Sequence, residues 1–167
     1  MKLVVTGGAG FIGSAVIRLA IARDIFVINI DALTYSARLE NLESVAKNSS
    51  YTFENVDICN RQDLDLIFQK YSPDAIIHLA AETHVDRSID NPAQFLETNI
   101  SGTFNLLEST RAYFKSPYSP SNFRFHHVST DEVFGSLPND QGIKFKEESP
   151  YNPRSPYSAS KASSDHL

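Results

Sequence analysis

The chain has 167 residues, a formal net charge of −5 at pH 7 and 41% hydrophobic residues. This length and composition predict one globular, soluble domain with enough apolar surface to form a core. The negative charge argues against a nucleic-acid partner. Cys59 is the only cysteine, which excludes a disulfide framework and favours a reducing, cytoplasmic compartment. No signal-peptide pattern or membrane-length apolar run is present, so we expect no membrane partner.

Four of the seven glycines lie in one short stretch behind the apolar run at residues 3–5. Glycine loses more conformational freedom on folding than any other residue, so this density needs a physical reason. Between a strand and a helix, the usual reason is close approach of the backbone to a phosphate at the helix N-terminus. The spacing is G-x-x-G-x-x-G, and we assign to a cofactor site Gly7, Gly10, Phe11, Ile12 and Gly13.

Strands and helices are expected to alternate along the chain. Short apolar runs predict strands at residues 2–6, 25–30, 51–56, 75–81 and 123–129. Helical spacing predicts helices at residues 10–23 and 63–71, from about 91 to 113, and from about 155 onward, with a short helix near residues 42–45. Residues 130–156 form a connection long enough to suggest a functional loop. The alternation predicts an α/β chain with a three-layer Rossmann fold and a parallel, doubly wound sheet.

In such a sheet, ligands bind beyond the carboxyl ends of the strands. Asp31 ends the second strand, where a carboxylate accepts hydrogen bonds from the ribose hydroxyls of NAD and would repel the 2′-phosphate of NADP. Asp57 ends the third strand, where it can accept from the adenine amino group. The alternative for both residues is a turn or a helix cap. We assign no metal site.

Tyr157 and Lys161 are four residues apart in the last predicted helix and therefore share a face. An adjacent ammonium favours the phenolate, so we expect the pKa of Tyr157 to lie below its usual value, in the range of a general base. Lys161 could also hold the nicotinamide ribose. The alternative is a chance pairing on a solvated helix face.

Asp131 and Glu132 follow the fifth predicted strand, at the edge of the sheet where a cofactor would lie. Removing water from a sugar needs an acid for the departing hydroxyl and a base for the neighbouring C–H. That C–H is acidic only beside a carbonyl, which NAD can create by oxidising the sugar. The alternative is that the two carboxylates are simply solvated.

The motifs T-G-G-A-G-F-I-G at residues 6–13 and Y-x-x-x-K at residues 157–161 resemble the extended branch of the short-chain dehydrogenase/reductase superfamily, which modifies nucleotide sugars. Within that branch the chain is most similar to the dTDP-glucose 4,6-dehydratases. The stretches that carry this similarity are residues 31–35, 57–59, 78–89, 98–100 and 129–135. The Asp-Glu pair in the last stretch is the most specific, because related epimerases lack it.

The resemblance implies a hydro-lyase with tightly bound NAD. Tyr157, assisted by Thr130 and Lys161, would take the proton of the sugar 4-hydroxyl. Glu132 would then remove the C5 proton while Asp131 protonates the departing C6 hydroxyl. Thr83 and Thr130 would contact the substrate. The remaining implied cofactor contacts are Asp31, Leu33, Thr34, Asp57, Ile58, Leu79, Ala80, Ala81, Thr98, Tyr157 and Lys161, with Asn99 nearby.

Members of this family are longer than this chain, so the sequence is expected to be the N-terminal portion of the enzyme, with the substrate-binding domain absent and little or no turnover by the fragment alone. The full-length enzyme would be a homodimer acting in deoxysugar and polysaccharide biosynthesis. Two alternatives stay open. One is another nucleotide-sugar 4,6-dehydratase, a decarboxylase or a 4-epimerase on the same fold. The other is a non-catalytic NAD-binding sensor.

Overall fold

The computed structural model describes residues 1–137, 142 and 144–167, which divide into two compact units. The sheet unit comprises Met1–Ala80 and Gly102–Val128, and the helical unit comprises Ala81–Ser101 and Ser129–Leu167. The predicted loop at residues 130–156 includes positions 138–141 and 143, which lie outside the described residues. Within the described part of the chain, no helix is long and apolar enough to cross a membrane.

Five parallel strands form the sheet, in the order β3-β2-β1-β4-β5. They are β1 (Lys2–Thr6), β2 (Phe26–Ile30), β3 (Tyr51–Glu54), β4 (Ala75–His78) and β5 (Arg124–His127). The central strand β1 pairs Val4 with Ile28 on one side and with Ile76 on the other. The predicted parallel, doubly wound Rossmann sheet is therefore confirmed, with strands somewhat shorter than the apolar runs suggested.

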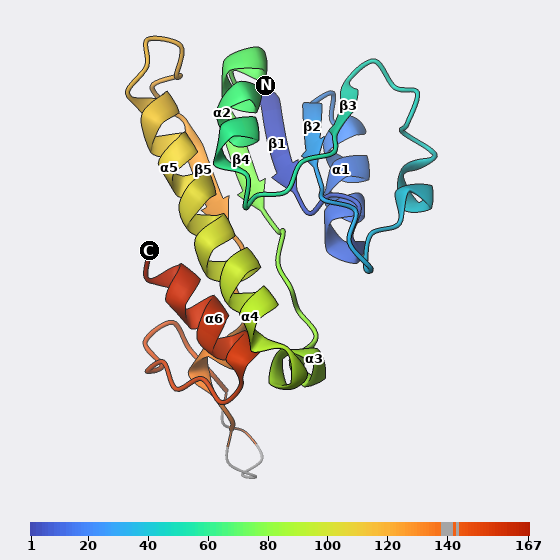
Figure 1. Cartoon of the computed structure of the whole chain (residues 1–167). Coiled ribbons are helices and arrows are strands. Elements are labelled where there is room, and N and C mark those ends of the chain that lie inside the picture. The colour runs from blue at the N-terminus through green and yellow to red at the C-terminus, as the bar shows by residue number, and fades with distance from the viewer. Residues whose placement is uncertain (138–141, 143) are drawn as a thin grey trace. The chain divides into compact units, whose positions relative to one another are not determined.

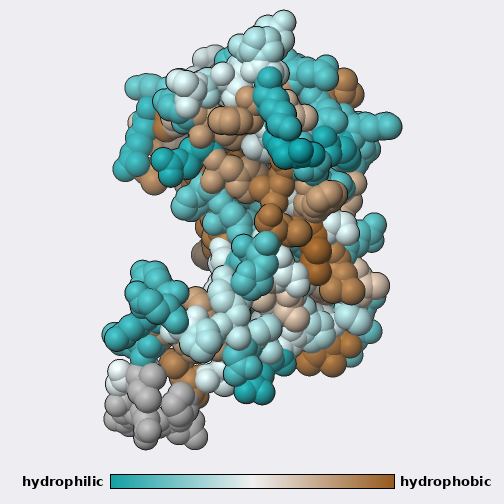
Figure 2. All heavy atoms as spheres, turned by 90° about the vertical axis from the view of Figure 1, so that its left-hand side faces the viewer, coloured by the Kyte–Doolittle hydropathy of each residue, from teal (hydrophilic) through white to brown (hydrophobic). Residues whose placement is uncertain are grey.

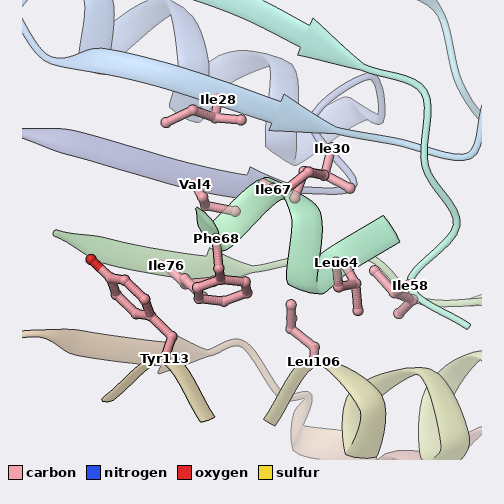
Figure 3. Close-up of a cluster of buried hydrophobic side chains, with 10 residues drawn as sticks. All are labelled: Val4, Ile28, Ile30, Ile58, Leu64, Ile67, Phe68, Ile76, Leu106 and Tyr113. Carbon is pink, nitrogen blue, oxygen red and sulfur yellow. The ribbon is translucent and has the colours of Figure 1, made fainter. Parts of the chain in front are cut away.

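Helices cover both faces of this sheet (Figure 1). Successive strand residues point to opposite faces, so Val4 packs toward α2 (Arg61–Tyr71) and α5 (Thr103–Phe114), whereas Leu3 and Val5 pack toward α1 (Phe11–Ile21) and η1 (Leu39–Leu42). Figure 3 shows the first cluster, in which the Phe68 ring and Leu106 face the strand side chains between the two helices. Phe68 and Tyr113 add a tilted ring contact with centroids 5.3 Å apart.

Local capping sets the limits of α2. The Asn60 side chain accepts a hydrogen bond from the Asp63 backbone N–H at 3.3 Å, so the helix begins before the predicted residue 63. At the other end, Ser72 adopts a left-handed conformation with φ of +47° and its N–H donates to the Phe68 carbonyl. The predicted short helix near residues 42–45 is a 3₁₀ helix, η1.

The helical unit contains α3 (Val85–Asp90), α4 (Pro92–Phe95), η3 (Asp131–Phe134), α6 (Pro156–Asp165) and most of the π-helix η2 (Leu96–Gly102). The predicted long helix from about 91 to 113 is confirmed in extent, because α4, η2 and α5 follow one another without a gap from Pro92 to Phe114, but the π-helical stretch and α3 were not predicted. Asn91 precedes α4, but its side chain makes no cap hydrogen bond. The predicted start of α6 is confirmed, since Ser155 and Ser158 form a reciprocal capping box with Pro156 at the first turn.

Candidate functional site

Two of the predicted glycines are required by the packing of the loop itself. Gly7 has a φ of +69°, and a Cβ there would lie 2.8 Å from both the N and the Cα of Ala80. A Cβ on Gly13 would lie 2.2 Å from the Gly7 carbonyl oxygen. Both obstacles are backbone atoms that cannot rotate away. Only glycine therefore allows the loop to lie against the end of β4.

Gly8 and Gly10 differ from this pair. A Cβ on Gly8 would lie 2.1 Å from the Asn29 side-chain oxygen, a packing role that sequence reasoning missed. Gly10 has an ordinary φ of −76°, and the nearest atom to its missing Cβ is the Gly7 oxygen at 3.2 Å. Packing within the chain constrains Gly10 least of the four, which is consistent with a role toward a ligand.

The start of α1 has the features of an anion site. Gly10 is the N-cap residue and no side chain caps the helix. The first two helical residues are exposed, Phe11 to 89% and Ile12 to 59%. The first N–H groups of a helix have no partner within it, and the helix dipole favours negative charge there.

Asp31 is buried and fastens the glycine loop to the exit of β2. Its Oδ2 accepts from the Ala9 N–H at 2.9 Å, and its Oδ1 accepts from the Leu33 N–H at 2.8 Å. Asp31 therefore does stabilise a turn, which was the alternative to a ribose-binding role. An ionised carboxylate has about four acceptor positions, so these two bonds leave room for ribose hydroxyls. Leu33 adopts a φ of +53°, and Thr34 beside it is exposed.

The side chain of Asp57 also serves a local turn. It is exposed, and its Oδ1 accepts from the Cys59 N–H at 2.8 Å. Ile58 is buried in the core, and a Cβ on Gly102 would lie 2.7 Å from its Cγ1. Of Asp57 and Ile58, therefore, only the Asp57 carboxylate and the backbone remain available to a ligand.

A buried histidine supports the loop from beneath. Thr6 Oγ1 accepts from the N–H groups of Leu79 at 3.2 Å and Ala80 at 3.1 Å, which occupy both of its lone pairs. Its own proton must then go to His78 Nδ1, 2.7 Å away. His78 is therefore the neutral tautomer with hydrogen on Nε2, which donates to Thr103 Oγ1 at 3.0 Å. Sequence reasoning found this histidine only as part of a motif.

In the helical unit, Thr130 caps η3 by accepting from the Glu132 N–H at 3.3 Å. The short helix carries Asp131 and Glu132, and both are exposed. Gly135 then turns the chain with a φ of +93°. The acidic pair is thus held in a defined helical turn within the predicted long loop.

Tyr157 lies on α6 and is 8% exposed. Its ring meets that of Phe95 edge-on, with centroids 6.4 Å apart. Burial raises the pKa of Tyr157, the Thr130 side chain lowers it, and the negative charges of Glu132, Asp131 and Asp165 raise it. The expected lowering of this pKa is therefore wrong for this structure, because burial and three carboxylates outweigh the effect of Thr130.

Lys161 is also buried, at 5% exposure. Burial lowers its pKa, and the Asp165 carboxylate opposes that effect. The alternative of a solvated helix face is excluded by the burial of both Tyr157 and Lys161.

Asn99 organises the rest of the helical unit and is not available as a ligand group. Its Oδ1 accepts from the Glu82 N–H at 2.8 Å, and its Nδ2 donates to the Glu82 carbonyl and to Ser160 Oγ, both at 2.9 Å. These bonds tie the chain after β4 to α6. Ala81 and Thr98 are partly exposed nearby in sequence, and Thr83 is exposed.

The family model described as GDP-mannose 4,6 dehydratase matches residues 4–167. The chain belongs to this family. A dTDP-glucose 4,6-dehydratase of Neisseria meningitidis is 59% identical over 170 residues, covering 99% of this chain and 47% of the relative. One from Escherichia coli is 54% identical and covers 100% of this chain and 49% of the relative. The chain thus spans about half the length of the curated relatives it matches.

Among solved structures, a dehydratase and a 4-epimerase can be compared with this chain. The dTDP-glucose 4,6-dehydratase DesIV of Streptomyces venezuelae, crystallised with NAD and TYD bound, has a TM-score of 0.88 at 41% identity, covering 99% of this chain and 50% of that one. The UDP-glucose 4-epimerase of Thermus thermophilus, in complex with NAD, has a TM-score of 0.84 at 32% identity, covering 99% and 49%. These epimerase and dehydratase folds are alike, and the sequence is more similar to the dehydratase.

Replacing His78 by Phe should destabilise the protein, because the hydroxyl groups of Thr6 and Thr103 lose their buried partner. We expect the free energy of unfolding in urea to fall by about 1–3 kcal/mol. His126→Phe, at an exposed position of β5, is the control and should change it by about 0.5 kcal/mol or less. Equal effects of the two changes would contradict the assigned network.

The raised pKa of Tyr157 has a defined consequence at alkaline pH. A group whose pKa is higher in the folded state contributes stability below its unfolded pKa, about 10 for Tyr, and that stability is lost as the pH rises through the folded pKa. Tyr157→Phe should therefore flatten the alkaline fall in the free energy of unfolding, measured in urea from neutral pH to above that value. Tyr118→Phe, at a 74% exposed position, should leave the slope unchanged.

Proposed function

We propose that this chain is part of a dTDP-glucose 4,6-dehydratase, an NAD-dependent hydro-lyase that forms dTDP-4-keto-6-deoxy-glucose. The observation that carries the proposal is the burial of Tyr157 and Lys161 on α6, the helix that packs against the turn bearing Asp131 and Glu132. Relatives of that name at 54% and 59% identity support the choice of substrate. Because the chain spans about half of them, the activity is proposed for the full-length protein, and the 167 residues alone should turn over weakly or not at all.

The sheet unit offers a site of the right chemistry for NAD. The uncapped start of α1 at Gly10 and the spare acceptor positions of Asp31 suit a pyrophosphate and a ribose. We assign the pyrophosphate to residues 10–13, the adenosine ribose to the loop after β2, and the adenine to Asp57. The bound NAD would accept a hydride from a sugar carbon and return it within one turnover.

Residues of the helical unit would move the protons. Tyr157 takes the proton of the sugar 4-hydroxyl, and the Thr130 side chain favours the phenolate. Lys161, buried on the same helix, supplies positive charge when protonated. Glu132 then removes the C5 proton, and Asp131 gives a proton to the departing C6 hydroxyl. Thr83 is assigned to the sugar, on family resemblance.

The acidic pair favours dehydration over 4-epimerisation. An epimerase needs one general base and a cofactor, whereas an elimination needs a further base and acid at neighbouring carbons. Asp131 and Glu132 are consecutive on one turn and exposed, so both can reach a substrate. The lower identity to the epimerase structure agrees with this choice.

Gly10→Ala should weaken NAD binding more than it weakens the fold, because a methyl group at the start of α1 would stand where the phosphates approach. A loss of about tenfold or more in affinity is expected by fluorescence titration, equivalent to about 1.4 kcal/mol. Gly13→Ala is the matched change in the same loop. It should lower the free energy of unfolding first, since its Cβ would lie 2.2 Å from the Gly7 oxygen. Unchanged NAD affinity in Gly10→Ala would contradict the pyrophosphate assignment.

Glu132→Gln should separate the first step from the second. In the full-length protein with dTDP-glucose, the variant should still reduce bound NAD, seen at 340 nm, because Tyr157 is intact. It should form the 4-keto-6-deoxy product, seen by its absorbance in alkali, at about a hundredth of the normal rate or less. Normal product formation would show that Glu132 is not the C5 base. A wild-type protein inactive on dTDP-glucose but active on a UDP- or GDP-sugar would move the proposal to another dehydratase.

We further propose that the full-length protein is a cytoplasmic homodimer that associates through α5. Phe104 and Phe114 on this helix are 50% and 57% exposed. Figure 2 views the side on which α5 lies in Figure 1 and shows hydrophobic residues among the hydrophilic ones on that surface. Phe104→Glu should shift the mass measured by sedimentation equilibrium from dimer toward monomer. Leu66→Glu, at a 60% exposed position of α2, should leave it unchanged.

A further inference from the structure

Asp165 has no part in the steps assigned above, yet it belongs to the same face of α6 as the proposed catalytic residues. It follows Lys161 by four positions and Tyr157 by eight, the spacing of one helical stripe. It is partly exposed, whereas Tyr157 and Lys161 are buried.

The Asp165 carboxylate joins α6 to the segment that precedes the acidic pair. Its Oδ2 accepts from the Ser129 hydroxyl at 2.5 Å. Ser129 directly precedes Thr130, which caps η3. The segment just before η3 is therefore joined to α6 by a charge-assisted hydrogen bond, which is stronger than a hydrogen bond between neutral groups.

The same oxygen joins α6 to the segment that follows the pair. Asp165 Oδ2 also accepts from the Tyr151 hydroxyl at 2.9 Å. The Tyr151 ring packs edge-on against Phe134, the last residue of η3, with centroids 5.4 Å apart. The Asn152 N–H donates to the Val133 carbonyl at 2.9 Å. One carboxylate oxygen thus holds both sides of η3.

The charge of Asp165 also acts on the two residues that it accompanies. It raises the pKa of Tyr157, together with Glu132 and Asp131, and it opposes the lowering of the pKa of Lys161 by burial. A neutral side chain with the same hydrogen bonds would hold η3 to α6 without changing these two pKa values.

We propose that Asp165 is a positioning residue of the dehydration reaction, which holds η3 and its acidic pair in register with α6 through Ser129 and Tyr151. The proposal rests on the proposed function for the identity of the reaction. It assigns to Asp165 no contact with substrate or cofactor.

The test uses the full-length protein and separates the effect of the Asp165 hydrogen bonds from the effect of its negative charge. Asp165→Asn keeps an oxygen acceptor and removes the charge, whereas Asp165→Ala removes both. The double change Ser129→Ala with Tyr151→Phe removes the two donors and keeps the carboxylate. Ser163→Ala, an exposed position of the same helix, is the control. The measurements are kcat and KM for dTDP-glucose, the pH profile of kcat, and the pKa of Tyr157 from ¹³C-tyrosine NMR, with its signal assigned by Tyr157→Phe.

Asp165→Ala and the double change should each lower kcat by about tenfold or more with KM within about twofold, because small displacements of reacting groups are costly. Asp165→Asn should lower the pKa of Tyr157 and move the acidic limb of the kcat profile to lower pH, since a like charge has been removed. Ser163→Ala should change none of these values.

The proposal would be overturned if kcat in Asp165→Ala or in the double change fell only in proportion to the loss of folded protein, judged by circular dichroism. A wild-type protein without activity on dTDP-glucose would refute the proposed function instead. The NMR titration would then still decide whether Asp165 acts on Tyr157.

Discussion

The close approach of the Gly7 backbone to Ala80 is the constraint on which the sheet unit depends. No side chain fits between them, since a Cβ would lie 2.8 Å from Ala80 N and Cα. The Thr6 hydroxyl group fixes the same approach by accepting from the N–H groups of Leu79 and Ala80, and its proton is directed to neutral His78. The ends of two adjacent strands are thus held together by backbone packing and one hydroxyl group. This contact therefore fixes the position of the glycine loop and of the start of α1.

The helical unit depends on a different kind of constraint. On α6 the buried residues include three serines, Tyr157 and Lys161, so its inward face is largely polar. Burying such groups is unfavourable unless each finds a partner. Asn99 supplies one connection, to Ser160 and Glu82, and Asp165 supplies another, to Ser129 and Tyr151. A polar network in which every group is hydrogen-bonded permits few arrangements. It can therefore fix the positions of titratable side chains more precisely than apolar packing does.

This difference explains what the sequence could predict. The strands, α1 and the start of α6 follow from apolar runs and helical spacing, and they are confirmed within a few residues. The π-helix contains Asn99, which bonds to residues 17 and 61 positions away, and no local pattern in the sequence indicates such contacts. The pKa of Tyr157 was predicted in the wrong direction, because the helix spacing to Lys161 was visible in the sequence but the burial and the carboxylates of η3 were not. The assignment of Asp31 to the ribose stays a prediction, and its two backbone bonds to Ala9 and Leu33 could only be weighed as an alternative.

The electrostatics of the helical unit also bear on the order of the proposed steps. Burial raises the pKa of Tyr157 and lowers that of Lys161, so it favours the pair with both groups neutral. Glu132 and Asp131 raise the pKa of Tyr157 further while they are ionised. In the proposed mechanism Tyr157 takes its proton in the oxidation step, and Glu132 and Asp131 act in the elimination that follows. Two of the charges that oppose the Tyr157 phenolate therefore belong to the residues proposed to act in the next step, and neutralising either would lower the pKa of Tyr157.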